Sequence, residues 1–157
     1  MTQLPETPPS RGYHARVSRD RRSPPVYDIE FYTTDDGDEP VRRWIKDELT
    51  PTKRRAIGAA MNRILAQEGV NVCKSEWGKA LGRGLYEFRL RDEIQGQGVT
   101  ESILLRVFFH PYGDKIIILL GGYDKGRHPS PKRQEREIAE ARKRLADFQS
   151  RQRTAHP

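Results

Sequence analysis

Three stretches in the middle of the chain decide the fold: LYEFRLR at 85–91, ILLRVFFH at 103–110 and KIIILL at 115–120. In the first two, apolar and polar side chains alternate with a period of two, which is typical of strands with one buried face. The third is continuously apolar and suits a central strand. The segments between them contain Gly or Pro, as expected of turns. We therefore predict three consecutive strands in an antiparallel sheet.

The region before these strands carries one more strand and two helices. VYDIEFY at 26–32 alternates in the same way and predicts a half-buried strand. Asp38 can cap a helix that has Pro40 in its first turn. Thr50-Pro51 restarts a second helix, which we expect to end at Gly69. Two helices separated by one proline predict a helical hairpin.

A last helix is predicted from Ser130-Pro131 onward, after a polar loop over 121–129. The element order is then β-α-α-β-β-β-α, an α+β fold with a small, mostly antiparallel sheet and the helical hairpin packed on it. We assign the domain to residues 26–150. Residues 1–25 are rich in Pro, Arg and Ser and predict a disordered basic arm, and 151–157 predict a frayed tail.

The charge of the chain is concentrated at its two ends. The net charge is +7, with five Arg against two acidic residues in 1–25 and ten Lys or Arg against four in 125–157. The middle, 26–124, carries fourteen basic and sixteen acidic residues. A basic periphery suits a polyanionic partner, because neutralising phosphates releases counterions. Charge alone leaves a second interpretation open, namely that the basic ends keep the protein soluble.

Several classes of protein are disfavoured by the sequence. No apolar run approaches the roughly 20 residues that a membrane-spanning helix needs, and the first 25 residues lack the apolar core of a signal peptide. The single cysteine, Cys73, excludes an internal disulfide and a thiolate-rich metal site. We therefore expect a cytoplasmic protein.

Arginines interrupt the predicted strands on the face opposite the apolar set. Arg89, Arg91 and Arg106 would share one sheet face, together with His110, if the strands are neighbours. Such a groove can hold a phosphate backbone and stabilise the charge that develops on a phosphorane. The alternative is a set of solvent-exposed arginines paired with Glu87 and Asp92.

Two flanking segments could add to this groove. Lys79 and Arg83 lie in the glycine-rich segment before 85–91, and YDKGRH at 123–128 gathers a phenol, two cations and an imidazole. Cleavage of RNA needs a base for the 2′-hydroxyl, an acid for the 5′-oxygen and cations for the phosphorane. Tyr123 and His128 are candidate proton carriers. Alternatively, the turn before a helix collects such residues for solubility.

A cluster of carboxylates at 35–39 suggests a metal site only weakly. Asp35, Asp36, Asp38 and Glu39 lie in a turn before a helix N-terminus, where acidic side chains favour the helix dipole. We therefore predict no metal site.

Several motifs occur in an order and spacing that resemble a known family. The segment from Lys79 to Arg89 (KALGRGLYEFR) resembles K-L-x-x-G-L-W/Y-E-x-R, and Ile103–Phe109 resembles a following x-x-Y-R-x-x-Y/F strand. The segment IIILLGGYDK at 116–125 resembles I-x-L-L-H-G-F-x-K-K, and EIAEARKR at 137–144 resembles E-I-x-x-A-x-x-R. These are motifs of the RelE/HigB superfamily of RNA-cleaving toxins, in its phage-derived Gp49-like branch. The resemblance covers some 120 residues.

The resemblance implies the toxin of a type II toxin–antitoxin system. Such a toxin is a metal-independent endoribonuclease without a cofactor, which cleaves mRNA through 2′-hydroxyl attack, usually in the decoding site of the 70S ribosome. It also implies a cognate antitoxin, expected to be a helix-turn-helix protein. By position, the catalytic residues would be Lys79, Arg89, Arg106, Tyr123, Lys125 and His128. The expected RNA-binding residues are Arg83, Arg91, His110, Arg127, Lys132 and Arg133.

The chain departs from the family pattern in the final loop. Asp124-Lys125-Gly126-Arg127 stands where many relatives have two adjacent lysines, and Gly121-Gly122 replaces a more usual histidine-glycine pair. These departures leave a second hypothesis, a non-catalytic RNA- or ribosome-binding phage protein on the same fold. A purely protein-binding module is the third.

Overall fold

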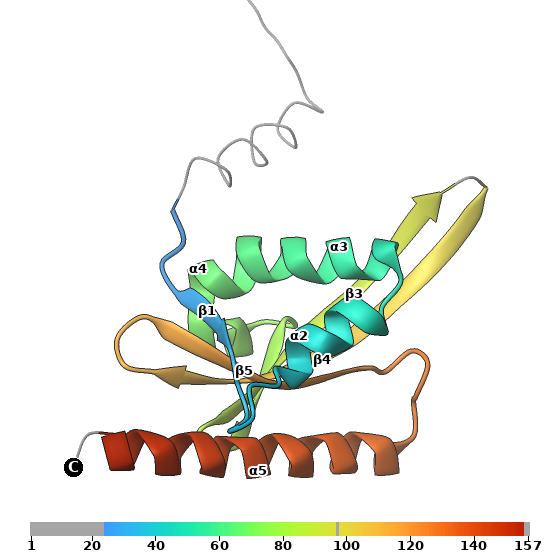
Figure 1. Ribbon diagram of the computed structural model, residues 1–157. Helices are drawn as coiled ribbons and strands as arrows, with labels where there is room; N and C mark the ends of the chain where they lie inside the picture. The colour runs from blue at the N-terminus through green and yellow to red at the C-terminus, as the bar shows by residue number, and fades with distance from the viewer. Residues whose placement is uncertain (1–23, 97, 156–157) are drawn as a thin grey trace, which may run out of the picture.

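A computed structural model of the chain describes residues 24–96 and 98–155 (Figure 1). The arm predicted at 1–25 lies outside the described residues except for its last two positions. The described residues form a single layered body, with helices on both faces of one sheet (Figure 1). The α+β class predicted from the sequence is confirmed.

The sheet contains five strands: β1 (Asp28–Phe31), β2 (Gly78–Gly82), β3 (Leu85–Gly96), β4 (Val99–Tyr112) and β5 (Ile116–Asp124). Their order is β1-β5-β4-β3-β2; β1 pairs with β5 in parallel and the other pairs are antiparallel. The sheet is therefore larger than the four strands we expected.

The strand missing from the prediction is β2, which we had taken as a glycine-rich segment before a strand. It is a short edge strand that pairs only with β3, and its register shifts between Ala80 and Gly82. Glycine and the lack of an apolar alternation hide such a strand from a periodicity argument.

The strand β5 is longer than predicted, because Gly121 to Asp124 continue it instead of opening the loop. Close packing explains why this strand has glycine at position 122. A Cβ atom at this position would lie 2.5 Å from the ring of Trp44. The glycine thus lets the first helix pack directly on the strand.

The first face of the sheet is covered by the predicted helical hairpin. It consists of α2 (Pro40–Asp47) and α3 (Pro51–Ala60), and the latter continues through a π-helical turn at Met61–Leu65 into α4 (Ala66–Glu68). A 3-10 turn at Gly69–Lys74 follows. The Thr50 hydroxyl accepts a hydrogen bond from the Lys53 amide and caps α3. We had expected Asp38 to cap α2, but it does not. Its carboxylate binds Arg43 instead, and Glu39 is the residue that directly precedes the helix.

These helices and the sheet enclose the larger of two apolar clusters. Val41, Trp44, Ile57 and Leu65 from the helices meet the inward side chains of β3, β4 and β5. The buried strand residues of this cluster are Phe88, Leu90, Ile103, Leu105, Val107, Phe109, Ile117 and Leu119. The inward positions predicted for 103–109 are therefore confirmed.

The opposite face carries α5 (Pro131–Ala155), the long C-terminal helix that lies below the sheet in Figure 1. Ala141 and Leu145 pack against Phe108, Ile118 and Leu120 in the smaller apolar cluster. The helix runs to Ala155, so the frayed tail expected from Arg151 is wrong for the described residues. Arg151 is held in place because its guanidinium donates to the Thr33 carbonyl and pairs with Asp147, each at 2.6 Å. Within residues 24–96 and 98–155, no helix is long and apolar enough to cross a membrane.

Candidate functional site

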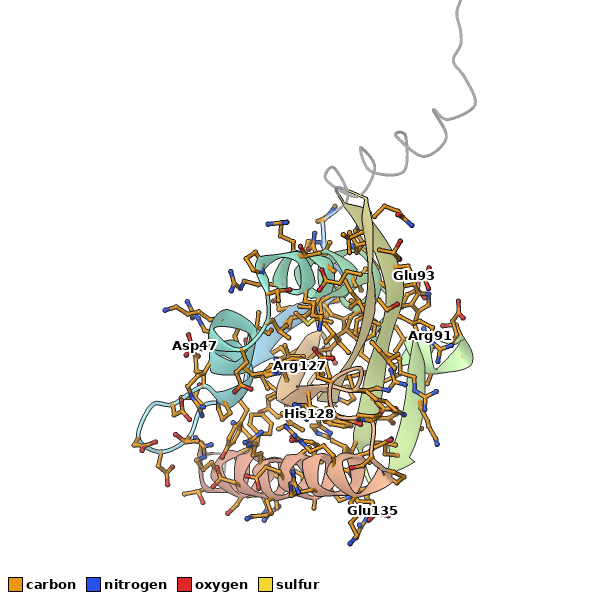
Figure 2. All side chains as sticks on the ribbon, turned by 90° about the vertical axis from the view of Figure 1, so that its right-hand side faces the viewer. Asp47, Arg91, Glu93, Arg127, His128 and Glu135 are labelled. Atoms are coloured by element: carbon orange, nitrogen blue, oxygen red, sulfur yellow. The ribbon has the colours of Figure 1, made fainter. Side chains whose placement is uncertain are left out.

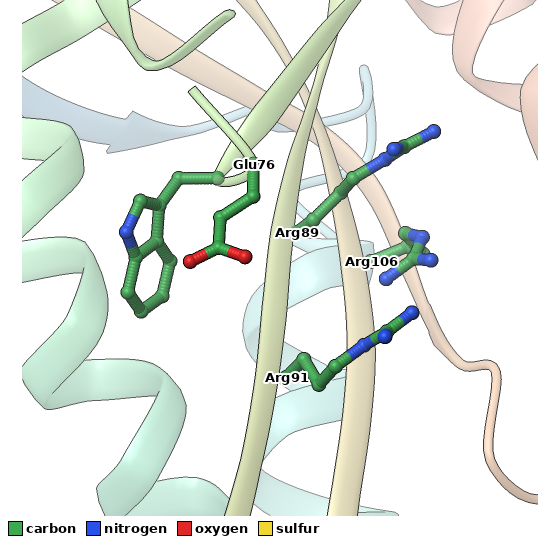
Figure 3. A pocket seen from close by; sticks show the side chains of 5 residues that line it. Glu76, Arg89, Arg91 and Arg106 are labelled. Atoms are coloured by element: carbon green, nitrogen blue, oxygen red, sulfur yellow. The ribbon is translucent and has the colours of Figure 1, made fainter.

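One row of side chains crosses β3, β4 and β5 on the face that carries α5. Arg89 on β3 lies opposite Arg106 on β4, which in turn lies opposite Tyr123 on β5. Directly opposed residues of neighbouring strands point to the same face. Arg91, two residues further along β3, points the same way, and Figure 3 shows all three arginines projecting to one side of the two strands. The shared face predicted for these arginines is confirmed.

A pocket of about 200 Å³ lies at this end of the sheet. Its lining combines the three arginines with Glu76 and Trp77, the two residues that precede β2. Figure 3 shows Glu76 on the side of β3 away from the guanidinium groups. A cavity of this size can take up a small polar group together with several waters. The three arginines of the lining favour an anion, whereas the carboxylate of Glu76 opposes one.

A buried carboxylate lies beneath the arginines. Glu87 is completely buried and belongs to the same face, two residues before Arg89. Its Oε1 accepts a hydrogen bond of 2.8 Å from Arg89 Nε, and its Oε2 lies 3.8 Å from Arg106 Nε. From the sequence, we had considered Glu87 only as a partner for exposed arginines. The pairing exists, but Arg106 is 4% exposed, so the pair is part of the interior.

Three polar atoms in this cluster have no hydrogen-bond partner among the residues that the structure describes. They are Glu87 Oε2, Arg106 Nε and Tyr123 Oη, and all three are buried. Leaving a buried polar group unpaired costs free energy, so native proteins keep few of them. A group of three in one place is typical of a site whose arrangement is not set by stability alone.

Burial and charge shift the pKa values of this cluster in directions that matter for chemistry. Burial raises the pKa of Tyr123, and the charge of Glu87 raises it further, although Arg106 opposes both. Burial lowers the pKa of Lys125, and the positive charges of Arg106, Arg89 and Arg91 lower it further against the opposing effect of Glu87. Tyr123 is therefore held as a neutral phenol, which can donate a proton. Lys125 is closer to the neutral amine that can accept one.

Burial also lowers the pKa of Arg106, since the charged form loses its hydration. The carboxylate of Glu87 counteracts this effect, whereas Arg89 and Arg91 add to it. The cluster is thus a set of mutually repelling cations that one buried carboxylate holds together.

The loop after β5 is ordered by a residue that we had regarded only as a departure from the family pattern. Asp124 Oδ2 accepts a hydrogen bond of 2.6 Å from Lys53 Nζ, and this ion pair is buried, with 11% and 7% of the two side chains exposed. Its Oδ1 accepts from the Arg127 amide at 3.2 Å. Helix α3 therefore fixes the start of the loop that carries Lys125. Neither Lys53 nor Asp124 was a predicted site residue, and only the lone acid in a basic loop signalled them.

The first turns of α5 join the site from the other side. The guanidinium carbon of Arg133 lies 5.9 Å from the centre of the Tyr123 ring, and Lys125 Nζ donates to Gln134 Oε1 at 3.3 Å. Arg127, His128, Lys132 and Arg133 line a separate, shallow pocket with Arg136. Figure 2 shows Arg127 and His128 together in the loop above the start of this helix. His128 thus belongs to a neighbouring basic surface, whereas Tyr123 and Lys125 belong to the arginine cluster.

The remaining predicted residues lie at different distances from the arginine cluster. Lys79 is exposed on β2 opposite Glu87, so it borders the cluster on the same face. His110 is four residues beyond Arg106 on β4, roughly 13 Å at the usual rise of a strand, and its Nδ1 lies 2.7 Å from the Gly84 carbonyl oxygen. Arg83, with a φ of 54°, forms the tip of the β2–β3 turn next to Gly84. The structure does not bring Arg83 and His110 together with the arginine cluster.

Within the described parts of the chain, no group of three or more His, Cys, Asp or Glu side chains is arranged to hold a metal ion.

No protein-family model matches the chain, and a search of curated proteins found no match. The candidate site therefore rests on its own geometry and on the motifs of the sequence.

Proposed function

We propose that this chain is an RNA-cleaving toxin of a type II toxin–antitoxin pair, on a fold like that of the RelE/HigB superfamily and its Gp49-like branch. In this proposal it is a metal-independent endoribonuclease that cuts mRNA on the 70S ribosome and is inhibited by a cognate helix-turn-helix antitoxin. The observation that carries the proposal is the row of Arg89, Arg106 and Tyr123 across three neighbouring strands, with Lys125 beside it. Arginines bind phosphate oxygens in a fixed geometry and stabilise the phosphorane.

The proposed reaction is a transesterification within the RNA. The neutral amine of Lys125 takes the proton of the 2′-hydroxyl, and the 2′-oxygen forms a bond to phosphorus. The bond from phosphorus to the 5′-oxygen breaks, and the Tyr123 hydroxyl gives its proton to that oxygen. The products are a 2′,3′-cyclic phosphate and a 5′-hydroxyl end. The lowered pKa of Lys125 supports its role as the base, and the raised pKa of Tyr123 keeps the phenol in the protonated form that an acid must have.

Expression of paired variants tests this proposal. We expect wild-type protein to arrest growth and R89A/R106A to abolish the arrest, because removal of one electrostatic donor to a transition state costs about 100-fold in rate or more. The matched control is R42A/R55A, which removes two exposed arginines from α2 and α3 on the other side of the sheet. The control should arrest growth like the wild type. Arrest by R89A/R106A at an equal protein level would contradict the site assignment.

A second function is favoured by one observation. Tyr123 is only 1% exposed, so its hydroxyl does not contact solvent in this conformation. A protein that binds RNA or the ribosome without cleavage would use the arginines and would not need the phenol. Intact transcripts bound to the ribosome together with this protein would support that alternative.

A further inference from the structure

The completely buried Glu87 stands out because it places a negative charge inside a site built for anions. Arg89 and Arg106 lie directly opposite each other on β3 and β4, and like charges in that arrangement repel. Glu87 accepts a hydrogen bond from Arg89 Nε at 2.8 Å and forms a looser ion pair, at 3.8 Å and without a hydrogen bond, with Arg106 Nε. Arg91 and Lys125 add two further cations to the same face. Without Glu87, the buried Arg106 would lack a counter-charge in the free protein.

The same carboxylate must weaken the binding of any anion to the arginines. A phosphodiester carries one negative charge, whereas the phosphorane that it becomes carries more. A fixed carboxylate below the guanidinium groups lowers their attraction for both, but it also holds the groups in orientation. Interactions that are realised only in the transition state raise the rate, while equal binding of both states does not.

We propose that Glu87 is a positioning residue, which orients Arg89 and Arg106 toward the phosphorane at the expense of affinity for uncleaved RNA. The inference rests on the proposed function and deepens it. The proposal predicts that the charge of Glu87 affects RNA affinity and that its hold on the arginines affects the cleavage rate. A purely structural role would not separate these two effects. Glu87 would act only through the two arginines and would not touch the substrate.

Two substitutions of Glu87 distinguish these effects. E87Q keeps the shape and removes the charge, whereas E87D keeps the charge and shortens the side chain by one methylene. Affinity is measured with a 2′-O-methylated oligoribonucleotide, which cannot undergo 2′-hydroxyl attack. Cleavage is measured in single turnover on mRNA bound to 70S ribosomes. Thermal unfolding of each variant reports whether it is folded.

For E87Q we expect tighter binding of the methylated RNA, by about tenfold at low salt, because an opposing charge has been removed. Its cleavage rate should fall by about 100-fold, since a neutral amide oxygen holds the charged guanidinium groups less firmly than the carboxylate does. For E87D we expect unchanged affinity and a reduced rate. R55A, on the opposite side of the sheet, is the control and should match the wild type in both measurements.

Several outcomes would overturn the inference. Weaker binding by E87Q would do so, as would an unchanged cleavage rate in both variants. Loss of folding in both variants would make Glu87 a structural residue and would equally overturn it. If the wild-type protein neither binds the methylated RNA nor cleaves mRNA on ribosomes, the proposed function itself fails. If the wild-type protein is active and the Glu87 variants behave like it, only the inference about Glu87 fails.

Discussion

The two faces of the sheet are built from alternate residues of the same strands, yet they differ in character. The face under α2 and α3 is apolar along most of β3, β4 and β5, and the buried Lys53–Asp124 pair lies at the end of β5. The other face is divided: one end is apolar and covered by α5, and the other end carries Glu87, Arg89, Arg91 and Arg106. The first face therefore provides stability, and the charged end of the second face provides the candidate site. Substitutions on the two faces should produce different kinds of loss.

The largest effect on stability is expected on the apolar face. Phe88 is completely buried and stacks on Trp77, with ring centroids 6.1 Å apart. F88A should lower the free energy of unfolding by about 3–5 kcal/mol, because it removes apolar contacts and leaves a cavity. F88L should cost less, since it fills most of the volume. Urea denaturation measures both. A loss below 1 kcal/mol for F88A would contradict the assignment of this face as the main core.

A somewhat smaller effect is expected where the apolar face supports the site. Replacing Lys53 with methionine leaves Asp124 without its counter-charge in a buried position, and we expect a loss of about 3 kcal/mol. The double variant K53M/D124L should regain much of this stability, because two apolar side chains can replace a buried ion pair. Both variants should bind RNA less tightly, since the loop that carries Lys125 loses its anchor. Undiminished RNA binding by both would show that the ion pair does not position the loop.

The smallest effect is expected at the covered end of the second face, far from the site. The hydrogen bond from Tyr32 and the pairing with Arg151 lower the pKa of the Asp147 carboxyl. A carboxyl with a lowered pKa in the folded protein stabilises the fold above its unfolded pKa of about 4 and loses this contribution as the pH falls further. We therefore expect a small fall of the unfolding temperature of the wild type below about pH 4.

D147N supplies the comparison for this effect, because it has no carboxyl to titrate. Its unfolding temperature should be lower than that of the wild type at neutral pH, and the difference should shrink as the pH falls below about 4. A difference that stays constant over this range would show that the charge of Asp147 is not involved.

The division between the two faces also explains what could be predicted from the sequence. The alternation in 85–91 and 103–110 predicted the shared face of Arg89, Arg91 and Arg106 correctly, because periodicity determines which residues point together. Periodicity could not reveal β2, whose two glycines and single lysine leave no apolar pattern. Alternation also places Glu87 on the face of the arginines, but it does not tell that this carboxylate is completely buried. It could not reveal the Lys53–Asp124 pair, because that pair joins segments distant in sequence. His110 shares the face of Arg106, but alternation does not tell how far apart two residues lie along a strand.

The most direct test of the account is the mapping of mRNA 5′ ends after induction of the wild-type protein and of R89A/R106A. We predict new 5′-hydroxyl ends within translated transcripts for the wild type and for the control R42A/R55A, and none above background for R89A/R106A. Transcripts that stay intact during growth arrest by the wild-type protein would contradict the claim that the charged end of the second face cleaves RNA.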